Sequence, residues 1–136
     1  MLNLLTAIKS KFIGSSLSTD VDGRIFYKES PQNSQFPYVV YFIVSDVPDN
    51  VFAKDGESVL MQFSLFSSSG GATEIATMYK DLKALLDDCS LTITSNNLVW
   101  FKRVNLTTMV DEITTVDGLQ KVDHWAVDYE VTMQES

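Results

Sequence analysis

The hydrophobic residues nearest the N-terminus recur at helical spacing. Four of them lie three or four positions apart: Leu2, Leu5, Ile8 and Phe12. Such spacing places apolar side chains on one face of an α-helix, and a following glycine commonly ends the helix. With Gly14 after the run, the pattern predicts an amphipathic helix over about residues 2–13. Polar residues and the turn signal Asp22-Gly23 separate it from the next segment.

A second stretch of helical periodicity follows the Ser- and Gly-rich segment 67–71. Its apolar positions again lie three or four residues apart: Ile75, Met78, Tyr79, Leu82, Leu85 and Leu86. Thr73 suits the N-cap position, and Glu74 suits the positive end of a helix. The pattern predicts a helix with one buried face over about residues 73–87.

Three strands are predicted before this helix. Residues 23–27 are a short strand candidate, and a loop with two prolines leads to the seven apolar or aromatic residues 38–44. This run does not alternate, which predicts that both its faces are covered. Residues 45–58 are mostly polar and are predicted to form a long connection to a half-solvated strand over 59–66. The two longer strands are expected to pair antiparallel.

The rest of the chain predicts further strands. Segments 91–94 and 98–106 are strand candidates, and a second polar loop is expected over about 107–120. From 122 to 133 the residues alternate, as in a long strand with one buried face. The two faces carry Val122, His124, Ala126, Asp128, Glu130 and Thr132 on one side, and Trp125, Val127, Tyr129, Val131 and Met133 on the other.

The predicted order is therefore helix, strand, strand, strand, helix, strand, strand. Its simplest packing is an α+β fold in which two helices cover one face of a mostly antiparallel sheet. A chain of 136 residues has the size of one domain, so residues 1–136 are interpreted as a single domain.

Charge and composition narrow the function classes. The formal net charge is −8, and the ten basic residues are scattered, with Lys102-Arg103 the only adjacent pair. A DNA-binding surface needs clustered lysine and arginine, so ordinary nucleic-acid binding is not expected. The N-terminal segment lacks the charge pattern of a signal peptide, and no run approaches the ~18 apolar residues of a membrane span. The single cysteine, Cys89, excludes an internal disulfide, and a reducing cytoplasmic compartment is predicted.

The sequence predicts no catalytic, cofactor or metal site. The one histidine, His124, lies next to Asp123, but neighbours in a strand point to opposite faces, so this pair lacks the geometry of a catalytic triad. Cys89 is interpreted as a packed thiol. The Ser- and Gly-rich segment 67–71 lacks the lysine and glycine spacing of a phosphate-binding loop. A cluster of acidic residues without the ligand spacing of an EF-hand is interpreted as a solvated loop: Asp46, Asp49, Asp55 and Glu57.

Two segments carry a resemblance to a known family. Gly23-Arg24-Ile25-Phe26 is followed by a polar loop with proline and then by Pro37-Tyr38-Val39-Val40-Tyr41. A β-hairpin, a helix and a terminal strand with an alternating Trp and Tyr pattern come after them. In this order of elements, over nearly the whole chain, the sequence resembles the tail-terminator or tail-completion proteins of long-tailed bacteriophages and prophages.

The resemblance implies a structural role. Such proteins form a hexameric ring on the head-proximal end of the tail tube, stop tail polymerisation and present the surface onto which the DNA-filled head docks. The implied partners are further copies of the chain, the tail tube protein and the head–tail connector protein. The implied locations are the host cytoplasm during assembly and the virion tail. An architectural role is implied for the motif residues Gly23, Arg24, Ile25, Pro37, Tyr38 and Val39.

The residues also favour an assembly role, because a ring needs a contact between two different surfaces of each copy. Segment 45–58 carries apolar residues amid charges and is predicted to contact an adjacent subunit or the tail tube. The predicted contact residues are Asp46, Val47, Asp49, Val51, Phe52, Asp55 and Glu57.

Two interpretations of the net negative charge remain open, as do alternative functions. Either the acidic residues serve solubility, or they line a lumen through which DNA passes without specific binding. The alternative functions are a neck or head-completion ring and, in a different class, an α+β module that binds a small ligand.

Overall fold

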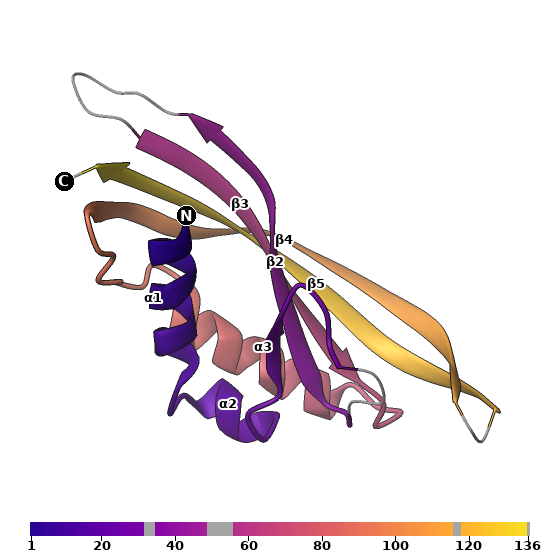
Figure 1. Cartoon of the computed structure of the whole chain (residues 1–136). Helices are drawn as coiled ribbons and strands as arrows, with labels where there is room; N and C mark the ends of the chain where they lie inside the picture. The colour runs from indigo at the N-terminus through magenta and orange to yellow at the C-terminus, as the bar shows by residue number, and fades with distance from the viewer. Residues whose placement is uncertain (32–34, 49–55, 116–117, 136) are drawn as a thin grey trace.

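In the residues that the structure describes, five strands form one mixed sheet, and three helices lie against one of its faces (Figure 1). The computed structural model describes residues 1–31, 35–48, 56–115 and 118–135. The helices are α1 (Leu2–Phe12), α2 (Ser16–Asp20) and α3 (Thr73–Leu86). The strands are β1 (Ile25–Tyr27), β2 (Tyr38–Pro48), β3 (Gly56–Ser67), β4 (Asn96–Thr115) and β5 (Gly118–Glu135).

The strand order across the sheet is β1-β2-β3-β5-β4. β1 runs parallel to β2, and the other neighbours are antiparallel. The predicted α+β fold with a mostly antiparallel sheet is therefore confirmed. β5 follows the other strands in the chain yet lies between β3 and β4, so the short β1 and the 20-residue β4 form the edges of the sheet.

The described part of the chain has three helices where the sequence predicted two. α2 is not predicted, because five residues with a single apolar side chain show no helical period. Its N-cap is Ser15, whose hydroxyl accepts a hydrogen bond from the backbone amide of Ser18 at 3.1 Å. Leu17 is fully buried and anchors this short helix on the core.

Both segments predicted as polar loops are strand wherever the structure describes them, so the predictions are wrong there; residues 49–55 and 116–117 lie outside the described residues. β2 continues to Pro48 and β3 begins at Gly56, and the two pair from Tyr38 to Pro48 with a register shift between Ile43 and Ser45. Most of segment 107–120 lies in the β4–β5 hairpin. Solvated strands can be polar on both faces, which removes the alternation that identifies a strand. Conversely, segment 91–94 is not a strand, and Ile93 there forms an isolated bridge.

The main core lies between the helices and the sheet. Phe63 of β3 is fully buried, and its ring contacts four others from α1 and three strands: Phe12, Tyr41, Phe101 and Tyr129. The buried face of α3 is as predicted, with Ile75, Met78, Leu82 and Leu86. In α1, Leu4 is buried and Leu2 is exposed, so the predicted face was wrong at its first position.

Only the first half of β2 is covered on both faces of the sheet. Val39 and Tyr41 are buried in the main core, and Val40 is buried on the outer face, which we define as the face of the sheet turned away from the helices. Val44 is exposed, because the strand continues past the core. The expectation that both faces are covered therefore holds for the start of the run and fails at its end.

A hydrogen-bond network holds the end of α3 on the sheet. The buried Tyr129 hydroxyl donates to Asp87 at 2.5 Å, and the Nε of Arg103 donates to the two Asp87 carboxylate oxygens at 3.2 and 3.3 Å. Arg103 also donates to the Tyr79 hydroxyl at 2.7 Å. Burial, and then the contact with Asp87, raise the pKa of Tyr129, so its hydroxyl remains a donor. Because Asp87 is the C-cap residue of α3, the network joins that helix to β4 and β5.

Candidate assembly surfaces

The two segments that carry the family resemblance lie side by side at one edge of the sheet. β1 pairs with the start of β2, and Ile25 lies opposite Val39. The Arg24 side chain reaches across to the residues that precede β2. Its Nε donates to the Pro37 carbonyl at 3.0 Å, and its Nη2 donates to the Phe36 carbonyl at 3.3 Å. Arg24 thus donates to two backbone carbonyls of the segment that leads into β2.

A hollow of about 330 Å³ opens between α1 and this edge strand. Its lining includes Lys9, Ile13, Gly23, Phe26 and Tyr27. Gly23 turns the chain into β1 with a φ of +75°, a conformation that favours glycine. The Nζ of Lys28 lies 5.8 Å from the centre of the Tyr27 ring, at the same edge. The hollow is therefore mainly apolar, with Lys9 in its lining and Lys28 beside it.

The predicted contact segment 45–58 contributes its first residues to β2 and its last residues to β3. Asp46 and Val47 lie in the exposed end of β2, and Glu57 lies in β3 opposite Pro48. The side chain of Val47 is exposed, as is that of Val44, so this end of the sheet presents apolar residues to solvent. The other predicted contact residues lie outside the described residues: Asp49, Val51, Phe52 and Asp55.

A second projecting surface is the hairpin end, which we define as residues 110–115 and 118–123. β3 pairs with β5 as far as Ser67, opposite Asp123, and beyond that point β5 pairs with β4. Figure 1 shows this two-stranded part (orange and yellow) projecting away from the helices. Val110 and Leu119 are exposed on it. Asp117-Gly118, which follows the β-branched run 114–116, is a hairpin signal that could have revealed it from the sequence.

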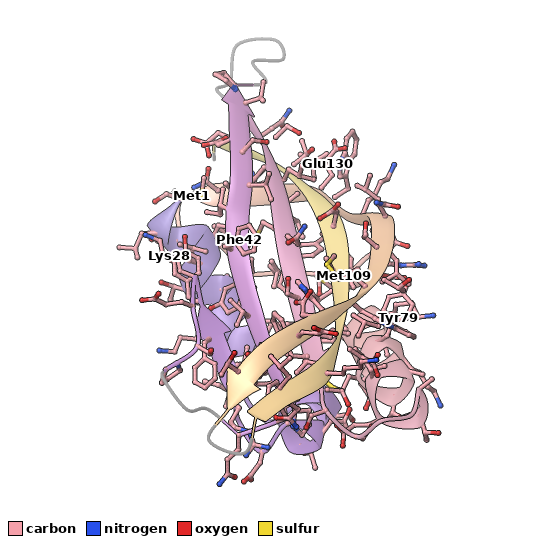
Figure 2. The ribbon with its side chains drawn as sticks, turned by 90° about the vertical axis from the view of Figure 1, so that its right-hand side faces the viewer. Met1, Lys28, Phe42, Tyr79, Met109 and Glu130 are labelled. Carbon is pink, nitrogen blue, oxygen red and sulfur yellow. The ribbon has the colours of Figure 1, made fainter. Side chains whose placement is uncertain are left out.

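An aromatic row crosses the outer face, which Figure 2 shows with Phe42, Met109 and Glu130 labelled. Tyr38, Phe66, His124 and Met109 lie opposite one another on four neighbouring strands. The rings of Tyr38 and Phe66 stack at 4.8 Å, and those of Phe66 and His124 stack at 4.3 Å. Such stacked pairs stabilise the sheet across its strands.

His124 has a carboxylate partner that the sequence did not reveal. Its Nδ1 lies 2.9 Å from an oxygen of Asp111 in β4, a residue expected in a loop. Asp123, its neighbour in the chain, lies on the opposite face of the sheet, in register with Ser67 of β3 and Val110 of β4. The His124–Asp111 pair binds the hairpin end to the outer face rather than forming part of a triad.

Two further titratable groups, Cys89 and Asp20, have shifted pKa values. Burial raises the pKa of the Cys89 thiol, which disfavours the reactive thiolate. Burial, together with the hydrogen bond and the negative charge of Asp81, raises the pKa of Asp20 to about 6. Within residues 1–31, 35–48, 56–115 and 118–135, no group of three or more His, Cys, Asp or Glu side chains could hold a metal ion. Over the same ranges, no helix is long and apolar enough to cross a membrane.

Comparisons with known proteins identify the family. The chain is similar in fold to a chain in the virion of a native gene transfer agent particle, with a TM-score of 0.62 and 12% identity over 93% of this chain and 92% of that one. A second solved structure, designated by a sequence identifier alone, has a TM-score of 0.54 and 11% identity over 95% and 93% of the two chains. No curated protein matches the sequence. The family model described as Tail completion protein gp17 matches residues 7–134, nearly the whole sequence, so this chain belongs to that tail completion family.

Proposed function

We propose that the chain forms a closed ring of six copies at the head-proximal end of a phage tail tube, where it ends tube polymerisation and provides the surface onto which the head docks. Membership of the tail completion family gives it a structural role in the tail. The observation that supports a ring is that exposed apolar residues lie on two unlike projections, Val44 and Val47 in β2 and Val110 and Leu119 on the hairpin end. Unlike surfaces on one copy favour head-to-tail contacts, which can close into a ring.

The end of the β2–β3 hairpin is proposed to contact an adjacent subunit or the tail tube. The proposed contact residues remain Asp46, Val47, Asp49, Val51, Phe52, Asp55 and Glu57. A matched pair of variants tests this, because Val47 and Val104 are 56% and 57% exposed on different strands. Val47→Asp is expected to impair tail capping, and Val104→Asp is expected to leave it intact. Equal capping by both variants would contradict the assignment.

The motif residues are proposed to support this architecture. Arg24 holds the start of β2 against β1 through the Pro37 and Phe36 carbonyls. This keeps the edge of the sheet, and the hollow beside it, in one geometry. Gly23, Ile25, Tyr38 and Val39 belong to the same two segments and would act with it.

DNA is proposed to pass through the ring without specific binding. The chain carries a net charge of −8, and Asp128 and Glu130 lie on the outer face. A negative lumen repels phosphates instead of holding them. We expect no measurable binding of the purified chain to duplex DNA at physiological salt. Tight binding that weakens steeply with added salt would contradict this part of the proposal.

Electron microscopy of lysates from a phage or prophage that lacks this gene tests the function. Overlong or uncapped tails beside full, unattached heads are expected. Normal-length tails with leaking or unjoined heads would instead indicate a neck or head-completion ring. Normal virions would contradict both and favour the module that binds a small ligand. Averaged images of isolated wild-type tail ends are expected to show six-fold symmetry.

A further inference from the structure

We propose that the hairpin end of one copy docks in the hollow between α1 and β1 of the next copy. This inference rests on the ring proposed above and names the two surfaces that would close it. The hairpin end supplies acidic and apolar side chains, and the hollow supplies apolar and basic ones.

The docking face of the hairpin end follows from the strand register. Val110 lies opposite Asp123, Glu112 lies opposite Lys121, and Thr114 lies opposite Leu119. All six belong to the face of the hairpin that, closer to the body, carries Trp125 against Tyr79 of α3 at 5.8 Å between ring centres. The hairpin end continues this face past the helix layer (Figure 1), which leaves Val110 and Leu119 exposed.

The net charge on this face is −1, and Lys121 lies opposite Glu112. Glu112 and Asp123 lie on it with one cation, Lys121. Asp111 belongs to the other face, where His124 holds it at 2.9 Å. The docking face therefore offers two carboxylates beside two exposed apolar side chains. A complementary surface would be apolar with lysine or arginine around it.

The hollow has this complementary composition. Ile13 and Tyr27 line it and are exposed, and Lys9 lines it from α1. Lys28 lies over the Tyr27 ring. The first 19 residues, which include α1, carry Lys9 and Lys11 and no acidic residue, although the chain as a whole has a net charge of −8.

Acidic groups lie nearby as well: residues 1–29 carry four basic and three acidic residues, Asp20 among them, for a net charge of +1 against −8 for the whole chain. Asp22 is paired with Arg24 at 3.6 Å, which offsets its charge. Glu29 follows Lys28 in the chain. The region around α1 and β1 is thus the basic part of an acidic molecule, and the hairpin end of an identical chain is a partner of the opposite sign.

The positions of the two surfaces suit a contact between copies. The hollow lies at the β1 edge, and the hairpin end belongs to β5 and β4 at the other side of the sheet. Figure 1 shows α1 and the hairpin end on opposite sides of the molecule, so a copy does not fill its own hollow. Docking one surface into the other gives a head-to-tail contact, the type that closes into a ring.

Disulfide cross-linking tests the contact directly. In a Cys89→Ser background, Leu119→Cys is combined with Ile13→Cys, and the chain is oxidised at high concentration and in assembled tails. Chains that carry both substitutions are expected to form a ladder of multimers, and an equimolar mixture of the two single variants is expected to form dimers at most. The control combines Leu119→Cys with Leu2→Cys, because Leu2 and Ile13 are both 75% exposed on or next to α1 while only Ile13 lines the hollow. The control is expected to form no ladder.

Charge reversal provides a second measurement. Glu112→Lys with Asp123→Lys, and separately Lys9→Glu with Lys28→Glu, are each expected to weaken self-association at least tenfold in sedimentation experiments. Mixing the two variants is expected to restore a complex, because each then carries one surface of matching charge. Lys80→Glu, an exposed change on α3, is expected to have no effect.

Two results would overturn the docking. One is the absence of the 13–119 cross-link in assembled tails, and the other is wild-type association of both charge-reversed variants. If tails still end normally in either case, the proposed function stands and the docking fails. If deletion of the gene leaves virions normal, the proposed function fails whatever the cross-linking shows.

Discussion

Tyr129→Phe tests whether the network at the end of α3 stabilises the fold. The substitution keeps the buried ring and removes the hydroxyl that donates to Asp87 at 2.5 Å. A hydrogen bond to a charged group contributes about 1.5–3 kcal/mol. Asp87 keeps Arg103 as a partner and its side chain is 31% exposed, so water can replace part of the loss. We therefore expect a loss near the lower end, about 1.5 kcal/mol.

This loss corresponds to a measurable shift in melting temperature. The entropy of unfolding is about 2.1 cal/mol/K per residue, or roughly 0.29 kcal/mol/K for a chain of this length, so Tm should fall by about 5 °C. Urea unfolding followed by the fluorescence of Trp100 and Trp125 gives the free energy directly. Tyr27→Phe is the matched control, because Tyr27 is exposed and its loss of a hydroxyl should change stability by less than about 0.5 kcal/mol.

A double-mutant cycle with Asp87→Ala separates the pair from its surroundings. If the hydroxyl acts through Asp87, Tyr129→Phe should cost about 1 kcal/mol less in the Asp87→Ala background than in the wild type. Additive effects of the two substitutions, or a Tyr129→Phe variant as stable as the wild type, would refute the reasoning.

Three further substitutions have expected effects on stability. Asp20→Asn should raise the free energy of unfolding at pH 7 by about 1 kcal/mol, a value reduced for solvent exposure, and should leave it nearly unchanged near pH 4. The reason is that the wild type loses stability as the pH rises from the unfolded pKa of 3.8 through the folded value of about 6, and urea midpoints over this range check the sign. Phe63→Ala should cost about 3–5 kcal/mol, since its buried ring contacts four others, and a smaller loss in urea unfolding would contradict the packing. Arg24→Lys should cost about 1–2 kcal/mol, because one ammonium cannot reproduce the guanidinium contacts with the Pro37 and Phe36 carbonyls, and an unchanged Tm would refute this role.

The helices and strands that bury one face and expose the other could be predicted from the sequence. The helix around Leu82 and the strand around Val127 both have a regular apolar period, because the core covers one side of each. The hairpin end lacks such a period, since Val110 and Glu112 lie on the same face and solvent reaches both. Its polar composition therefore led to the prediction of a loop over residues 107–120.

The candidate surfaces could be predicted in part. The segments around Arg24 and Pro37 were found by their residues, but their contact depends on a parallel pairing that local pattern does not encode. The hollow beside β1 depends in the same way on where α1 lies. His124 was expected not to be oriented by Asp123, and Asp111 reaches it because the pairing of β4 with β5 brings the two side chains together. Contacts set by tertiary pairing are invisible to periodicity.

The position of β5 has a consequence for how the chain can fold during synthesis. Of the five described strands, β5 leaves the ribosome last, yet it lies in the sheet between β3 and β4. Until it emerges, β3 and β4 each expose an unpaired edge, and the pairing of Gly56 with Gln134 joins residues far apart in the chain. The sheet is therefore expected to be completed only after this strand has been translated. A chain cut short within β5 would leave the β3 edge unpaired, and we expect it to be prone to aggregation rather than to join a growing tail.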